Sequence, residues 1–374
     1  MHLSQLRDTK VGVDATLWLS TVYNALGDHE KERQVEVFKV YCRERIDVLK
    51  RHGITDITMV FDGNATPIKT QIEIMNIKRE KIKEMKGNNS KMKDKKHKMK
   101  KEMKDPESFN IKPEFKYIPN RDKLLEWLTS KDMSLKYIVA PYEADAQLTY
   151  LAVKGIIDAV ITEDSDLIPF GCPNIIYRLN IKTEMCKYYS FSHLNELEDY
   201  KDFTDKKLLE MCIMVGCDYL PNIENLGIRK AYDEIVQWES YTEILKKTKT
   251  ELKLRTETEA FEKNKQKIER SFEKAILAFT YQQVYDPISQ TCERLSHIKY
   301  KHLRQENAEF LGPFLKDKSV HDIATGKRSS EINETDHYLE QKIYPQMEDV
   351  LPRKRTFKQM SVTNYFVPEP NYKC

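Results

Sequence analysis

The sequence predicts an α/β protein with a doubly wound, mostly parallel sheet flanked by helices. Short apolar runs alternate with helical stretches along the chain, which is typical of parallel sheets. Several of these runs are followed at once by an aspartate. The seven cysteines are scattered without a CxxC pair, which argues against a disulfide or zinc framework and favours a reducing compartment.

The predicted elements follow in order along the chain. Short buried runs predict strands at residues 10–13, 57–61, 137–139, 159–161 and 175–179. Apolar spacing predicts helices at residues 15–26, 35–50, 124–128 and 144–153. From residue 208 the chain is predicted to be helical for much of its length, ending near 285–288. We therefore expect a core at 1–290, an extension at 291–325 and a polar tail at 326–374.

Charge is distributed unevenly. Between Lys78 and Lys104 there are thirteen lysine and arginine residues against four acidic ones, whereas the whole chain has a net charge of +3. The helical pattern of this segment is interrupted at 87–90, which predicts a partly helical arch over about 67–113. Such a run is either a solvated tether or, between two acidic motifs, a contact for a phosphate backbone. No apolar stretch predicts a membrane span, and residues 1–10 do not resemble a secretory signal.

Two acidic pairs lie close together in the sequence: Glu143 and Asp145, then Asp164 and Asp166. Carboxylates are not gathered at a half-buried site without cations, because each disfavours ionisation of the others. Since neither histidine nor cysteine accompanies them, the pattern favours Mg²⁺ or Mn²⁺ over Zn²⁺.

Further acids follow other predicted strands, namely Asp14 and Asp62. A single aspartate at such a position is most often a helix cap. Several segments that share this feature indicate a common site, because ligands of parallel sheets bind beyond the carboxyl ends of the strands.

Several long motifs together resemble a known family. The runs VAPYEADAQL, ITEDSDLIPFG and GCDYLPNIENLGIRKA, with VGVD, VFDG and YDPI, are similar to the 5′-nuclease superfamily of flap endonucleases and XPG-like proteins, most of all its exonuclease 1 branch. The resemblance covers roughly residues 10–290. It implies the 5′-nuclease fold, with a helical arch and a DNA-binding helix–two-turn–helix element at about 208–236.

The resemblance also implies site residues. It assigns a two-metal Mg²⁺ site, in which Mn²⁺ can substitute, to seven acids: Asp14, Asp62, Glu143, Asp145, Asp164, Asp166 and Asp218. Asp145, Asp164 and Asp166 are expected as the inner ligands, and some of the others should act through water. Lys69 and Asp166 are the expected catalytic residues, with Lys69 neutralising charge on the phosphate.

DNA contacts are expected from the arch and from a turn that opens a helix. They are Lys69, Lys78, Arg79, Gly227, Arg229 and Lys230. Backbone N–H groups at the turn suit a phosphate, although a plain helix N-terminus has the same pattern. The resemblance adds K⁺ at this turn.

The sequence departs from the family pattern in four places. The family's Met-Gly-Ile start and the short helix before its first strand are not expected here. Ser20 stands at the stacking position, Asn76 at the second basic arch position and Asn225 at the first glycine of the K⁺ turn. These changes concern the grip on DNA.

The tail contains a pattern similar to the box that binds the sliding clamp (PCNA). Gln359, Val362, Tyr365 and Phe366 have the spacing of that box. Arg353–Lys354–Arg355 is a short basic patch that suits nuclear import.

These features lead to one main hypothesis, a metal-dependent 5′ to 3′ DNA exonuclease with 5′-flap endonuclease activity that acts in the nucleus. The alternatives are a flap endonuclease, a catalytically weak clamp-bound DNA adaptor and an RNA-directed nuclease. The complete acid set disfavours the adaptor, and the helix–two-turn–helix element and clamp box disfavour the RNA nuclease.

Overall fold

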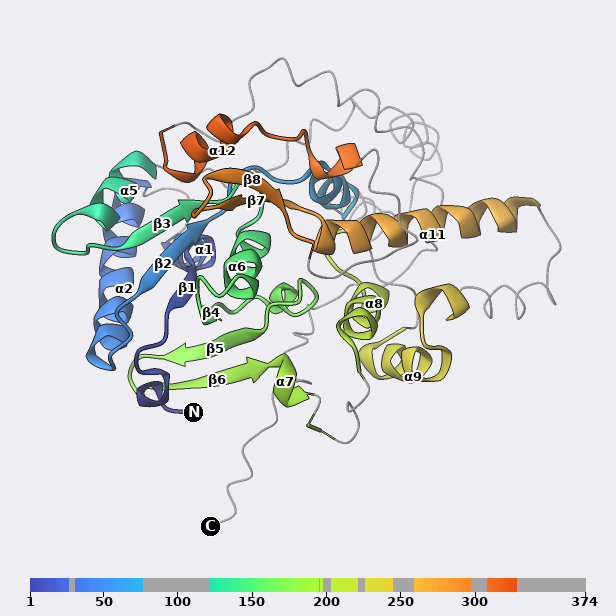
Figure 1. Ribbon diagram of the computed structural model, residues 1–374, viewed down its shortest axis with the longest axis horizontal. Helices are drawn as coiled ribbons and strands as arrows, with labels where there is room; N and C mark the ends of the chain where they lie inside the picture. Colours follow the sequence, from blue (N-terminus) through green and yellow to red (C-terminus); the bar gives the residue numbers. More distant parts are fainter. Residues whose placement is uncertain are drawn as a thin grey trace, which may run out of the picture.

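A six-stranded sheet forms the centre of the protein (Figure 1). The computed structural model describes residues 1–26, 31–76, 121–194, 196–197, 203–220, 226–244, 259–296 and 308–327. The sheet comprises β1 (Val11–Asp14), β2 (Ile57–Phe61), β3 (Lys136–Val139), β4 (Ala159–Ile161), β5 (Asn174–Asn180) and β6 (Met185–Ser190). Their order is β3-β2-β1-β4-β5-β6, and only the β5–β6 pair of this sheet is antiparallel. The predicted fold class is confirmed.

Helices cover both faces of the sheet. They are η1 (Leu3–Leu6), α1 (Ala15–Leu26), α2 (Lys31–Arg51), α5 (Arg121–Thr129), α6 (Ala144–Val153), η3 (Ser165–Leu167), α7 (Phe191–Leu194), α8 (Asp205–Val215), α9 (Ile228–Trp238), α11 (Glu259–Thr280), η5 (Ala308–Leu311) and α12 (Asp317–Ala324). A hairpin of β7 (Gln283–Asp286) and β8 (Thr291–Arg294) lies between α11 and α12 in the chain.

Strand side chains alternate between two hydrophobic cores. Met59 and Phe61 of β2 pack in one core with α1, α2 and α5, whereas Val60 belongs to the other core with α6, α8 and α11. Alternation follows from the two-residue period of a strand, and because both faces are covered, the strands are apolar on both sides. In Figure 1, α2 and α5 lie on one side of the sheet and α6 on the other.

The helix α6 packs directly on β1. A Cβ atom at Gly12 would lie 2.5 Å from a methyl carbon of Ile157 and 2.7 Å from one of Leu148, so a larger residue would require these two side chains to shift. This close contact holds the first turn of α6, which carries Asp145, beside the end of β1.

The C-terminal hairpin is fastened to α6 by one buried side chain. Gln147 donates from Nε2 to the carbonyl oxygen of Tyr285 and accepts from its backbone N–H, both at 2.7 Å. The expectation of helix up to 285–288 is therefore wrong, because Gln147 and the partner strand β8 satisfy this backbone in extended form. The sequence analysis also missed β6, which continues the sheet beyond β5.

A short helix does precede the first strand, contrary to expectation. In η1, His2 caps the helix, and Leu3 and Leu6 are buried. Four residues are too few for a helical apolar period to be recognised. Elsewhere, α8 and α9 pack on each other at the position expected for the helix–two-turn–helix element. No helix of the described residues has the length and apolarity needed to cross a membrane.

Candidate metal centre

Acidic side chains gather where strands β1, β2 and β4 end. Asp14 is the last residue of β1, Asp62 follows β2, and Asp164 lies three residues after β4. Electrostatic contacts that shift pKa values link the seven predicted acids and Lys69 into one cluster. The structure therefore brings together the residues that the sequence analysis assigned to one edge of the sheet.

Asp14 and Asp62 are oriented by hydrogen bonds at the start of neighbouring helices. Asp14 accepts from the backbone N–H of Leu17 at 2.9 Å and from the hydroxyl of Thr162 at 3.1 Å. Asp62 accepts from the backbone N–H of Ala144, the first residue of α6, at 2.7 Å. Each carboxylate therefore has a fixed direction before any ligand binds.

The loop after β2 depends on Gly63. Its N–H donates to the carbonyl oxygen of Tyr142 at 2.7 Å, and a Cβ atom at this position would overlap the carbonyl oxygens of Ala140 and Pro141. Only glycine allows the two backbones to approach this closely. The approach aligns Asp62 with the start of α6.

The central acids are Asp145, Asp164 and Asp166. Asp164 caps η3 by accepting from the N–H of Asp166 at 2.9 Å. Burial raises the pKa of Asp145 well above its usual value, and the charges of Asp164 and Asp14 add to the effect. Burial likewise raises the pKa of Asp166, with further contributions from Asp164 and Asp218. The positive charge of Lys69 acts on both Asp145 and Asp166 but does not outweigh burial.

Asp14 shows the same effect. It is 5% exposed, and burial together with the charge of Asp62 raises its pKa to about 7. A carboxyl group perturbed in this way marks a functional site more often than a structural one.

Glu143 differs from the other acids, because protein donors surround both of its oxygens. Oε1 accepts from the Thr66 hydroxyl and from Nε2 of Gln282, each at 3.0 Å. Oε2 accepts from the Tyr219 hydroxyl at 2.8 Å and from Lys69 Nζ at 3.0 Å. Four charge-assisted hydrogen bonds hold this carboxylate.

Lys69 joins the two sides of the cluster. Its ammonium lies 3.0 Å from Glu143 Oε2 and 2.8 Å from Asp218 Oδ2. Burial alone would lower the pKa of Lys69, but the negative charges of Glu143 and Asp218 raise it well above its usual value. The side chain is therefore a permanent cation at the edge of the acidic cluster.

The donor set fits hard divalent cations. The seven acids offer oxygen atoms, the ligands that Mg²⁺ and Mn²⁺ prefer. Among the described residues, no three of these carboxylates have oxygen atoms that all lie within 4.8 Å of one another. A divalent cation held among these carboxylates would offset their mutual repulsion.

The expected DNA contacts are placed in part. Gly227 is the N-cap of α9, and Arg229 and Lys230 in its first turn are exposed. Gly227 is exposed, and no described residue lies within 4 Å of where its Cβ atom would be. Ser20 lies half-buried in α1. Outside the described residues lie Lys78, Arg79, Asn225, the patch 353–355, and the clamp-box residues Gln359, Val362, Tyr365 and Phe366.

Sequence reasoning missed the residues that position Glu143. Thr66, Tyr219 and Gln282 are buried and reach it from segments far apart in the sequence. Only Tyr219 had a local signal, its place directly after Asp218.

The chain is similar to known proteins over much of its length. Residues 1–86 match the family model of the XPG N-terminal domain and residues 134–218 match that of the XPG I-region. The protein named Exonuclease 1 of Oryza sativa subsp. japonica is 34% identical over 338 residues, which are 86% of this chain and 36% of that protein. Exonuclease 1 of Arabidopsis thaliana is 32% identical over 341 residues, 87% of this chain and 42% of that protein.

Among solved structures, the catalytic core of Rad2 in complex with a DNA substrate aligns with a TM-score of 0.51 at 20% identity. The alignment covers 72% of this chain and 76% of that one, and it supports the fold. Fold and matched regions define the class of XPG-like α/β proteins. The chain carries both the N-terminal domain and the I-region of the XPG family and is similar to proteins named Exonuclease 1. It spans well under half the length of the two curated relatives.

Proposed function

We propose that the protein is a Mg²⁺-dependent 5′ to 3′ DNA exonuclease that also cuts 5′ flaps. One observation supports this proposal above all: seven carboxylates and one lysine cluster at a single edge of the sheet. Within the cluster, the pKa values of Asp14, Asp145 and Asp166 are raised. A cluster that holds its own protons so strongly is suited to exchange them for divalent cations.

The seven acids have different roles in binding the cations. Asp145, Asp164 and Asp166 are the inner ligands, because the charge of Asp164 helps to raise the pKa of both Asp145 and Asp166, so the three carboxyl groups lie close together. Asp14, Asp62 and Asp218 complete the ligand set, directly or through water. Glu143 acts through water, since four protein donors already occupy its oxygens. Divalent cations held by these residues would supply activation of a water and stabilisation of the leaving oxygen of a phosphodiester.

Lys69 supplies the cation for the phosphate itself. Its ammonium is paired with Glu143 and Asp218 and lies at the border of the acidic cluster. A fixed positive charge that meets negative charge developing on a phosphoryl oxygen lowers the barrier to hydrolysis. Lys69 and Asp166 are therefore the catalytic residues of the proposal.

The helices α8 and α9 bind the DNA duplex outside the acidic cluster. The exposed Arg229 and Lys230 and the open N-terminus at Gly227 suit a phosphate of the duplex, with K⁺ at the preceding turn. Lys78 and Arg79 of the arch add contacts to the strand that is cut.

Cleavage of 5′-labelled blunt, recessed and flapped DNA with Mg²⁺, in the wild type and in Asp166→Asn, tests the proposal. Mononucleotide release from blunt or recessed ends that is lost in Asp166→Asn is the expected result. Cutting confined to flap junctions would identify a flap endonuclease instead. Equal cleavage by the two proteins, or none by either, would refute the site assignment.

The proposal includes the sliding clamp PCNA as a partner and the nucleus as the place of action. Gln359, Val362, Tyr365 and Phe366 match the clamp-binding box, and the patch 353–355 suits nuclear import. The double variant Tyr365→Ala/Phe366→Ala should lose clamp binding in a titration while cleaving DNA normally. Undiminished clamp binding would rule out the box.

A further inference from the structure

We propose a second metal site, made by His2, His52 and Glu184, that binds Zn²⁺ and is separate from the acidic centre. The three side chains come from the residue before η1, the residue after α2 and the turn between β5 and β6. One ligand atom of each lies within 4.8 Å of the other two. None of the three belongs to the proposed nuclease site.

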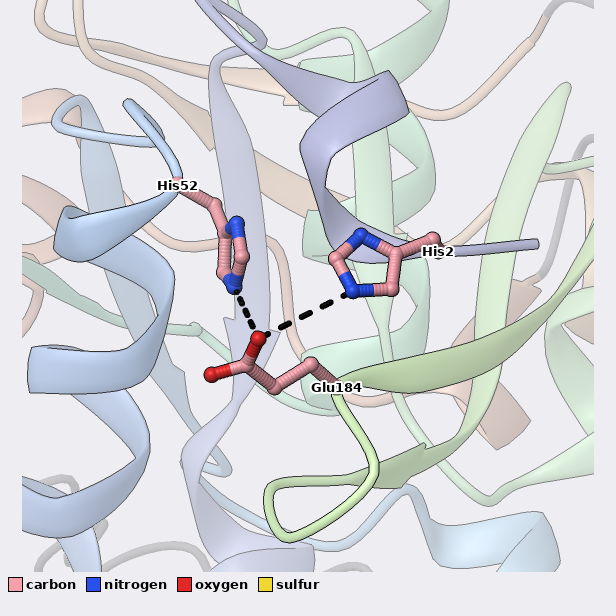
Figure 2. Close-up of side chains that lie close together, drawn as sticks. All are labelled: His2, His52 and Glu184. Atoms are coloured by element: carbon pink, nitrogen blue, oxygen red, sulfur yellow. Dashed lines mark ion pairs between the residues drawn. The ribbon is translucent and has the colours of Figure 1, made fainter.

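The two imidazoles converge on a single carboxylate oxygen. Nε2 of His52 lies 3.0 Å from Glu184 Oε2, and Nε2 of His2 lies 3.7 Å from the same atom (Figure 2). A tetrahedral zinc ion with bonds of about 2.0–2.2 Å holds its ligand atoms about 3.4 Å apart. The two separations from Glu184 Oε2 bracket this value, and one ligand atom of each histidine lies within 4.8 Å of one on the other.

His52 carries the strongest single indication of a ligand. Its Nε2 atom is buried, yet it forms no hydrogen bond within the described part of the chain. The approach to Glu184 is close enough for an ion pair but lacks the alignment of an N–H donor with its acceptor. A buried nitrogen that faces a carboxylate without donating to it is suited to give its lone pair to a shared cation.

The neighbours of the triad orient it for this role. Nδ1 of His2 lies 2.9 Å from the Ser4 hydroxyl, which can accept its proton and leave Nε2 free to bind the ion. In that tautomer His2 gives up the contact that Nδ1 accepts from the Ser4 backbone N–H. Arg51 lies 3.5 Å from the other carboxylate oxygen, Oε1 of Glu184, so Oε2 remains directed at the two rings.

The chemical type of the three ligands indicates which metal ion the site prefers. Two imidazoles and one carboxylate suit Zn²⁺, whereas the all-oxygen centre suits Mg²⁺. Three protein ligands leave a fourth position for water, which solvent can reach because the His2 side chain is 43% exposed.

Bound zinc would fasten the N-terminal segment to the body of the protein. Backbone bonds already join these segments, from Leu3 N–H to the Glu184 carbonyl and from Cys186 N–H to the Met1 carbonyl, each 2.9 Å long. An ion shared by His2, His52 and Glu184 would also link the N-terminal residues and the β5–β6 turn to the end of α2. Since Zn²⁺ binds the folded site, it should raise the melting temperature.

Calorimetric titration with Zn²⁺ in excess Mg²⁺ tests the site. The full chain should bind one Zn²⁺, and the affinity should fall by more than about 100-fold in His52→Gln and in Glu184→Gln, since outer partners alone are worth about 10- to 100-fold. His193→Gln, a change at an exposed histidine outside the triad, and Asp145→Asn in the acidic centre should retain the zinc site. Far-UV circular dichroism checks that each variant is folded.

Three results would overturn the proposal. The first is wild-type protein that binds no Zn²⁺ in excess Mg²⁺. The second is wild-type affinity in both His52→Gln and Glu184→Gln, which would leave an ordinary ion pair. The third is loss of the zinc site in Asp145→Asn, which would place the ion in the acidic centre.

Discussion

The ammonium of Lys69 donates to Glu143 Oε2 at 3.0 Å, which ties the helical segment 67–76 to the start of α6. The same ammonium lies 2.8 Å from Asp218 beyond α8. One cation therefore balances acids from two segments that are far apart in the sequence. Substitution of Lys69 should affect the chemical step more than the fold, because the side chain is 23% exposed and borders the site.

Lys69→Met should lower kcat by about 10²- to 10³-fold, the usual effect of removing one group that stabilises transition-state charge. KM for DNA and the affinity for Mg²⁺ should change little. Lys136→Met is the matched control, since Lys136, the first residue of β3, pairs with Asp56 at an exposed site. Steady-state kinetics on a labelled recessed substrate measure the difference. Equal kcat values for the two variants would remove Lys69 from the catalytic set.

Much of the centre could be predicted because its signals are local. Asp14, Asp62 and Asp164 each follow a buried strand within three residues, so parallel pairing alone brings them to one edge. Thr66, Tyr219 and Gln282 could not be predicted, since their meeting at Glu143 depends on packing between segments 76 to 139 residues apart. The zinc triad is hidden from sequence for the same reason.

The errors in the fold have equally specific causes. Residues 283–286 follow a long helix without a break in composition, and their extended form depends on Gln147 of α6 and on β8. The strand β6 continues a sheet whose other pairs are parallel by turning back on β5, an arrangement that no local period indicates. Tertiary partners, rather than local preference, decide both segments.

Tyr219→Phe should destabilise the protein by about 1.5–3 kcal/mol, the contribution of a hydrogen bond to a charged group. Its hydroxyl donates to Glu143 at 2.8 Å and accepts from Gln282 at 2.9 Å. Tyr177→Phe is the control, because the Tyr177 hydroxyl is also buried but makes no hydrogen bond with any described residue. Urea denaturation compares the two midpoints. If the variants unfold together, the network around Glu143 contributes nothing to stability.

Asp145→Asn should stabilise the protein in EDTA at pH 8 and abolish cleavage. Burial and neighbouring acids raise the pKa of Asp145, so neutralising it relieves repulsion in the folded state. Activity should fall by at least about 10³-fold, since a metal-held charge is worth several kcal/mol and about 1.4 kcal/mol is a factor of ten.

Asp286→Asn provides the opposite control for Asp145→Asn. Burial raises the pKa of Asp286, but hydrogen bonds from Ile288 and Ser289 outweigh it and leave the pKa lowered. Its neutralisation should lower the melting temperature in EDTA and leave cleavage intact. A lower melting temperature for Asp145→Asn would contradict the repulsion argument.

Gly63→Ala should destabilise the protein by about 1–3 kcal/mol or more, the range for overpacked sites. The added methyl group overlaps the carbonyl oxygens of Ala140 and Pro141, and relief of the overlap separates Asp62 from the start of α6. Gly227→Ala is the control for stability, because nothing lies within 4 Å of the added atom. Thermal unfolding of both variants tests the difference, and equal melting temperatures would show that the loop yields freely.

Stabilisation by Mg²⁺ should increase with pH between about 5.5 and 8. The folded pKa of Asp14 is raised to about 7, chiefly by burial and Asp62, and those of Asp145 and Asp166 are also raised. Unfolded aspartate titrates near 3.9, so between about 4 and 7 the folded chain binds more protons than the unfolded chain. The contribution of these groups to stability in EDTA is therefore present at low pH and is lost as pH rises.

Mg²⁺ reverses this trend, because it binds the ionised carboxylates and must displace protons at low pH. The rise in melting temperature on adding Mg²⁺ should accordingly be small at pH 5.5 and large at pH 8. Asp145→Asn, which removes one of the raised carboxyl groups, should flatten the dependence, whereas Asp286→Asn should preserve it. A rise that is equal at both pH values, or greater at pH 5.5, would mean that these carboxyl groups are not the ones that exchange protons for the metal.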